Sequence, residues 1–138
     1  LILFGGGLSL AKAINSSGLG QWLGEAFILV INFEPWVLVL LIITFIIFLT
    51  ELTSNTATTS TFLPIAASIA VALSVSPSNI AIPLVLASSL AFMLPVATPP
   101  NAIVYGSGKL TIKNMIKAGF ILNLVGIIFI SLAYNFIF

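Results

Sequence analysis

Apolar residues form long runs along the chain, and short polar clusters separate these runs. The runs do not alternate between apolar and polar positions, so they predict helices, because lipid permits only helices or closed barrels. The predicted fold class is all-α, that of a polytopic membrane protein. A straight crossing needs about 20 apolar residues. Of the runs in this chain, residues 118–138 best fit an ordinary spanning helix.

Two shorter runs predict a different arrangement over residues 34–76. The runs Trp36 to Leu49 and Phe62 to Val75 flank a hydroxyl-rich cluster, which extends from Thr50 to Thr61. Pro35 can open the first run as a helix, because the first helical position needs no amide donor. Two short arms around a polar tip predict a re-entrant helical hairpin.

The other segments complete one membrane domain. Residues 1–33 are predicted to be scaffold helices. Residues 79–108 are predicted to form a broken transmembrane helix, whose first part runs from Ile80 to Leu94 with Asn79 as its cap. Residues 118–138 are the predicted final transmembrane helix.

The hydroxyl-rich cluster predicts an interruption of helix. Any single hydroxyl can bond back to a carbonyl one turn earlier, or bond across a helix contact. For the whole cluster a break is favoured, because Ser54 and Asn55 are strong N-cap residues inside an apolar stretch. Non-helical backbone at membrane depth must be buried in protein or line a water-filled cavity. Glu51 also favours a site, since a charge at the bilayer centre costs about 3 kcal/mol; a glutamate near the interface is the alternative.

A second interruption is predicted by Pro99 and Pro100, which cannot donate to carbonyls of the preceding turn. Thr98 lies before a proline and is pushed out of the helical region, so the Ala97 and Thr98 carbonyls also lose helical partners. Bare carbonyls suit a hard cation. The helix that restarts at Pro100 or Asn101 points its free amides and positive dipole end at the gap, which suits an anion. Secondary transporters with inverted repeats use this combination.

Composition narrows the function classes. Of 138 residues, 60% are hydrophobic and 5% are charged, and the mean hydropathy is +1.30; a soluble domain has about 25% charged residues. The net charge of +1 comes without a basic stripe, which argues against nucleic acid as a partner. The chain has no His, Cys or Asp, so we expect no enzyme. Arginine is absent too, so dipoles and co-bound cations would hold a carboxylate.

Charge also predicts orientation. Lys109, Lys113 and Lys117 precede the final helix, and the positive-inside bias places the start of that helix in the cytoplasm and the C-terminus outside. Their spacing also fits one face of a short surface helix, for which solvation is a sufficient explanation. Because the chain begins at Leu1, we expect it to be a fragment.

Two motifs resemble those of the divalent anion:sodium symporter family. Thr50-Glu51-Leu52-Thr53-Ser54-Asn55-Thr56-Ala57 resembles the second Ser-Asn-Thr signature of that family. The segment Pro95 to Gly108 resembles its Thr-Pro-Pro-Asn loop, and the Gly5-Gly6-Gly7-Leu8 segment agrees as well. The resemblance identifies the chain as the C-terminal inverted repeat of a sodium/dicarboxylate or sodium/sulfate symporter. It implies an elevator transporter that works as a homodimer in membrane lipid, with the N-terminal repeat of the same transporter as partner.

The resemblance also implies site residues by motif. A sodium ion, the expected cofactor, would be held by main-chain carbonyls and one side chain: the carbonyls of Thr50, Thr53 and Ala97, and the side chain of Asn55. The substrate carboxylate would meet side chains at both interruptions, namely Ser54, Asn55, Thr56 and Thr98. Pro99 would shape that substrate pocket.

The predicted function is sodium-coupled transport of small divalent anions, with C4-dicarboxylates such as succinate as the first choice. The predicted location is a bacterial inner membrane. Sulfate or citrate symport and proton-coupled anion transport are alternatives within the class. Outside it, an ion channel with a hydroxyl-lined filter and a non-transporting scaffold are the alternatives.

Overall fold

The computed structural model describes residues 35–137 continuously, together with residues 6, 9, 12–14, 16–19 and 22. The predicted scaffold helices over 1–33 therefore lie largely outside the described residues. In the described part every long regular element is a helix: α3 Pro35–Thr50, α4 Asn55–Ala72, α5 Pro77–Ser88, α6 Pro99–Gly106 and α7 Ile112–Ile137. The predicted all-α class is confirmed for this part of the chain.

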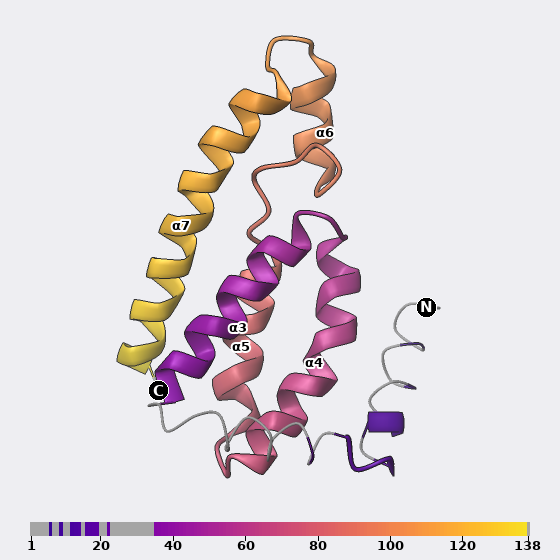
Figure 1. The fold of residues 1–138 in the computed structure, drawn as a ribbon, viewed down its shortest axis with the longest axis vertical. Coiled ribbons are helices and arrows are strands. Elements are labelled where there is room, and N and C mark those ends of the chain that lie inside the picture. Colours follow the sequence, from indigo (N-terminus) through magenta and orange to yellow (C-terminus); the bar gives the residue numbers. More distant parts are fainter. Residues whose placement is uncertain are drawn as a thin grey trace.

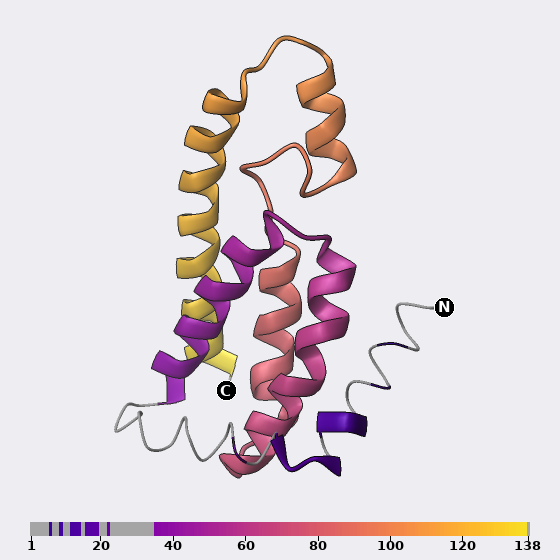
Figure 2. The ribbon, with the colours of Figure 1, turned by 45° about the vertical axis from the view of Figure 1, so that its right-hand side comes forward.

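Helices α3, α4 and α5 pack together, and α7 lies along α3 (Figure 1). Helix α6 stands beyond the end of this bundle, as the turned view in Figure 2 also shows, and it has no buried residue. Two non-helical segments lie at that same end. We call residues 51–54, between α3 and α4, the first break, and residues 89–98, between α5 and α6, the second break.

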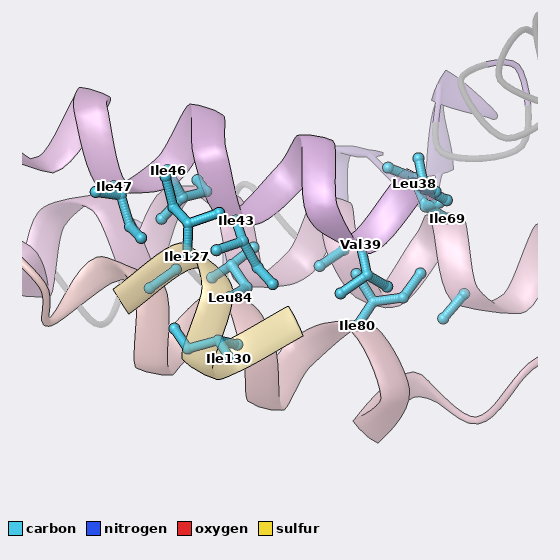
Figure 3. Close-up of a cluster of buried hydrophobic side chains, with 13 residues drawn as sticks. Leu38, Val39, Ile43, Ile46, Ile47, Ile69, Ile80, Leu84, Ile127 and Ile130 are labelled. Atoms are coloured by element: carbon cyan, nitrogen blue, oxygen red, sulfur yellow. The ribbon is translucent and has the colours of Figure 1, made fainter. Parts of the chain in front are cut away.

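The core of the bundle is a stripe of branched side chains on α3 that meets three other helices (Figure 3). On α3, Leu38, Val39, Ile43, Ile46 and Ile47 recur at helical spacing, and each is at most 2% exposed. They pack against side chains of the other helices, namely Ile69, Ile80, Leu84, Ile127 and Ile130. Many small dispersion contacts of this kind fix the four helices relative to one another, and so fix where the two breaks lie.

Helix α7 is the one helix in the described part that is long and apolar enough to cross a membrane. It has 26 residues, and its most apolar 18-residue window has a mean hydropathy of 2.2; only 17% of that window is buried in the structure. At 1.5 Å per residue it is about 39 Å long, more than the roughly 30 Å of a bilayer core. Helices α3 and α5 are apolar but shorter; the 16 residues of α3 reach about 24 Å.

The predicted start is correct for the first arm of the hairpin and wrong for the second arm. The first arm begins at Pro35, as predicted, and ends at Thr50. The prediction that the second arm begins at Phe62 is wrong, because α4 begins at Asn55. Ser54 caps α4 and lets the hydroxyl-bearing residues after it become helical, so the interruption is much shorter than the polar cluster.

The predicted bounds of the next helix are also wrong. Ser76, with extended backbone, takes the N-cap position in place of Asn79, and Pro77 occupies the first turn because its fixed φ suits that position. Helix α5 ends at Ser88 instead of Leu94. The amides of Phe92, Met93 and Leu94, which lie beyond the end of α5, donate to the side chain of Glu51 from the first break. They therefore do not continue the hydrogen-bond ladder of the helix.

The final helix begins earlier than predicted, at Ile112 instead of Ala118. Thr111 provides the reason, because its hydroxyl Oγ1 accepts a hydrogen bond from the Asn114 amide at 3.3 Å and caps the first turn. Lys113 and Lys117 therefore belong to α7 itself, where both are exposed.

Candidate ion and anion site at two helix breaks

The first break is short and closed by a cap. Ser54 has extended backbone (φ −80°, ψ 142°), and its Oγ accepts a hydrogen bond from the Ala57 amide at 3.1 Å. The helix therefore restarts at Asn55, directly after the Ser54 cap that indicated the break, and not at Phe62. The free amides of the first turn of α4 and its positive dipole end lie at this point of the chain.

Thr50 and Asn55, both predicted sodium ligands, lie together at this break. Thr50 is fully buried, and its hydroxyl hydrogen is shared between the Asn55 Oδ1 at 3.1 Å and the Ser88 carbonyl at 3.0 Å. The Asn55 oxygen has two lone pairs, so it can accept from Thr50 and still bind a cation. This hydroxyl also joins the end of α3 to the end of α5.

Other hydroxyls of the cluster bond to one another or to the helix backbone. The hydroxyls of Thr53 and Thr58 lie 2.6 Å apart, and so do those of Thr59 and Ser88. Ser60 Oγ donates to the Thr56 carbonyl one turn earlier at 2.7 Å. The alternative of local back-bonding thus holds for Ser60, whereas the Thr59 hydroxyl ties α4 to α5.

The second break ends at Thr98, whose backbone is extended (φ −142°, ψ 152°), as its place before a proline predicts. Its Oγ1 accepts a hydrogen bond from the Asn101 amide at 3.3 Å, and α6 begins at Pro99 instead of Pro100 or Asn101. The prediction that the Thr98 carbonyl lacks a helical partner is wrong, because it accepts the Ala102 amide at 3.1 Å. Thr98 is already the N-cap of α6, so its carbonyl receives the first helical bond.

The main-chain oxygens predicted to bind sodium lie at the two breaks. Within the described residues no hydrogen bond is donated to the carbonyls of Thr50, Thr53 or Ala97. Hard cations take several oxygen ligands from carbonyls and amide side chains. Three carbonyls and the Asn55 oxygen fit that chemistry.

The predicted substrate residues are accessible. Ser54, Thr56 and Pro99 are exposed, and Asn55 and Thr98 are half-buried. In the part of the chain that the structure describes, no hydrogen bond joins those of the first break to those of the second. Both sets nevertheless lie at the same end of the bundle, near the starts of α4 and α6 (Figures 1 and 2).

Glu51, outside the predicted ligand set, joins the two breaks. It is 3% exposed, and its carboxylate accepts hydrogen bonds from the amides of Phe92, Met93 and Leu94, at 2.7 to 3.0 Å. The sequence favoured a site at Glu51, with a glutamate near the interface as the alternative, and did not indicate which groups Glu51 binds. Its partners lie 41 to 43 positions away along the chain.

Helix α7 contacts the same junction through two residues that the sequence analysis missed. Asn123 is fully buried and its Nδ2 donates to Glu51 Oε1 at 2.8 Å. Gly119 lies so close to the second break that an added Cβ would be 2.5 Å from the Phe92 carbonyl carbon. The available signal was an amide and a glycine within a largely apolar span, which also contains Gly126, Ser131 and Asn135. A further missed residue, Asn101, donates through Nδ2 to the carbonyls of Ala91 and Leu94.

Comparison with known proteins identifies the family. The model described as the sodium:sulfate symporter transmembrane region matches residues 1–137. The chain belongs to this family. The predicted membership of the divalent anion:sodium symporters is thereby confirmed, and the chain is part of an integral membrane protein.

Several curated proteins of this symporter family are close relatives. The sodium-dependent dicarboxylate transporter SdcS of Staphylococcus saprophyticus is 53% identical over 137 residues, which are 99% of this chain and 26% of the relative. The SdcS of Staphylococcus aureus is 50% identical over the same shares. Solute carrier family 13 member 2 of the mouse is 49% identical over 135 residues, 98% of this chain and 23% of the relative. The chain spans about a quarter of the length of these relatives.

Proposed function

We propose that this chain is the C-terminal repeat of a sodium-coupled symporter for small divalent anions, of which C4-dicarboxylates such as succinate are the first choice. The observation that carries the proposal is that two interruptions of helix lie at one end of the bundle and are joined by Glu51. The names of the relatives, which specify sodium dependence and dicarboxylates, support the same ion and substrate. A symporter has no need of the acid–base groups that the chain lacks.

The proposed site uses each break for both ligands. Sodium binds main-chain carbonyls of the two breaks and the Asn55 oxygen, and the substrate carboxylate lies at the starts of α4 and α6. The side chains proposed to meet the carboxylate are those of Ser54, Asn55, Thr56 and Thr98, and Pro99 shapes the substrate pocket. Amide ends and positive helix dipoles stabilise an anion there without arginine, and a bound sodium ion lowers the cost of bringing a dianion to the same place.

The proposed architecture follows from helix length. Helices α3 and α4 form a re-entrant hairpin, because α3 is too short to cross a bilayer. Helices α5 and α6 are the two halves of a broken transmembrane helix. The N-terminal repeat of the same transporter supplies the other half of the site, and the whole protein works as a homodimer by an elevator movement in a bacterial inner membrane. The exposed lysines at the start of α7 favour a C-terminus on the outside.

Sodium replacement tests the coupling. In vesicles that contain the full-length protein, labelled succinate should accumulate with external sodium chloride and should not accumulate when choline replaces sodium. Accumulation in choline driven by an inward proton gradient would favour the proton-coupled alternative. Competition by excess unlabelled sulfate or citrate ranks the anions, and electrical currents far above transporter turnover would favour a channel.

Thr98→Ala is expected to raise the KM for the dianion about threefold to tenfold, with little change in maximal rate. The substitution removes the hydroxyl that caps α6, a loss of about 1 kcal/mol, and it removes a proposed substrate contact. Thr98→Ser keeps the hydroxyl and should restore the wild-type KM. Thr111→Ala is the matched control, because it removes an equivalent cap from α7 and should leave KM unchanged. Equal KM values for the two alanine variants would exclude Thr98 from the substrate site.

A further inference from the structure

Glu51 is a buried acidic side chain that the proposed ion and substrate contacts do not use. Its Oε1 accepts hydrogen bonds from the Phe92 amide at 2.7 Å and the Met93 amide at 2.9 Å. Its Oε2 accepts from the Met93 amide at 2.9 Å and the Leu94 amide at 3.0 Å. Both oxygens are therefore engaged by successive main-chain amides of the second break.

Successive backbone amides that converge on one point form an anion-binding concavity. In this chain the anion in that concavity is the carboxylate of Glu51, which comes from the first break. These amides are consequently not open to a substrate carboxylate. Their role is to fix the second break against the first.

Helix α7 completes the arrangement from another direction. Asn123 Nδ2 donates to Glu51 Oε1 at 2.8 Å, and Asn123 is fully buried. Gly119, one turn earlier on α7, lies directly against the main chain of Phe92 and Met93. A single carboxylate thus joins the α3–α4 turn, the second break and α7.

We propose that Glu51 is a positioning residue for sodium: by binding the amides of the second break, it holds the Ala97 carbonyl at the correct distance from the carbonyls of Thr50 and Thr53. Glu51 directly follows Thr50 in the chain. On the other side, Leu94 is bound to Glu51, and its carbonyl accepts the Ala97 amide at 3.3 Å. The inference rests on the proposed sodium-coupled function.

Glu51→Gln in the full-length protein tests the proposal. Glutamine keeps the size of the side chain but replaces one acceptor oxygen by an NH2 group, which would face amide hydrogens. We expect the sodium concentration for half-maximal succinate uptake to rise at least tenfold, with a maximal rate at saturating sodium within about twofold of wild type. We also expect faster hydrogen–deuterium exchange in the peptide that contains residues 92–97.

Asn123→Leu is the second variant, in case Glu51→Gln does not reach the membrane. It removes one donor to Glu51 while filling a similar volume, and should raise the half-saturating sodium concentration about threefold. Asn135→Leu is its matched control on the same helix, because Asn135 is exposed and its Nδ2 donates to the Ser131 carbonyl one turn earlier. The control should behave as wild type in both assays.

The outcomes separate this inference from the proposed function. If the wild-type protein shows no sodium-dependent uptake, the proposed function fails, and the exchange measurement still reports on the contact of Glu51 with the second break. If wild-type uptake depends on sodium, but Glu51→Gln leaves either half-saturating sodium or exchange unchanged, the positioning role alone is overturned. If only Asn123→Leu reaches the membrane, an unchanged half-saturating sodium concentration in that variant overturns the positioning role of Glu51.

Discussion

Asn55→Ala in the full-length protein is expected to reduce sodium-dependent succinate uptake at least about 100-fold, while the amount of protein in the membrane stays the same. Asn55 is the first residue of α4, is half-buried, and has its Oδ1 3.1 Å from the Thr50 hydroxyl. Alanine removes a proposed sodium ligand and a proposed substrate contact together. A hydrogen bond to a charged group contributes about 1.5 to 3 kcal/mol, and each 1.4 kcal/mol of binding free energy corresponds to about tenfold in affinity.

The expected loss of succinate uptake by Asn55→Ala should not come from unfolding of the protein. The Thr50 hydroxyl keeps its second acceptor, the Ser88 carbonyl at 3.0 Å, and Ser54 remains the cap of α4. Asn135→Ala is the matched control, since the exposed Asn135 lies far from both breaks in the chain and should support wild-type uptake. Substantial sodium-dependent uptake by Asn55→Ala, measured with labelled succinate at equal protein content, would remove Asn55 from the site and with it the proposed assignment of the first break.

Features that depend on local chemistry could be predicted from the sequence. Proline has no amide hydrogen and restricts the residue before it, so Pro35 marks the start of α3, and Thr98 has extended backbone. Ser54 is a strong capping residue inside an apolar stretch, so a restart of helix nearby followed from residue type. These effects act within one turn of the residue that causes them.

Features that depend on contacts between distant segments could not be predicted in the same way. The end of α5 at Ser88 goes with the binding of later amides by Glu51, which precedes them by 41 to 43 positions. The Glu51–Asn123 hydrogen bond joins residues 72 positions apart. Hydrophobic periodicity does not contain this information. An apolar run such as Ile80 to Leu94 looks like one helix until the acceptor for its last amides is known.

The hydroxyl-rich cluster is an intermediate case. Its composition correctly indicated a break. The hydroxyl groups of the cluster nevertheless have several different hydrogen-bonding roles, which composition alone does not distinguish. Thr50 and Thr59 bind across to α5, whereas Ser60 bonds within its own helix. The residue types are nearly identical, so only the direction that each side chain takes on the helix distinguishes a local partner from a distant one.

Gly119→Ala is expected to destabilise the full-length protein by about 1 to 3 kcal/mol, the usual cost of an extra methyl in a tightly packed interior. An added Cβ would lie 2.5 Å from the carbonyl carbon and oxygen of Phe92 and 2.6 Å from Met93 Cα. These are main-chain atoms, and Glu51 binds the amides of the same two residues. The second break therefore cannot move away from α7 without losing hydrogen bonds to a buried carboxylate.

Gly126→Ala on the same helix is the matched control for Gly119→Ala. Its added Cβ would also meet an atom at 2.6 Å, but that atom is Leu90 Cδ1, the end of a flexible side chain. Leucine can change its χ angles at small cost, so this variant should unfold close to the wild-type temperature. Thermal unfolding of both variants in detergent measures the difference. Equal stabilities would mean that Gly119 on α7 does not pack tightly against the second break.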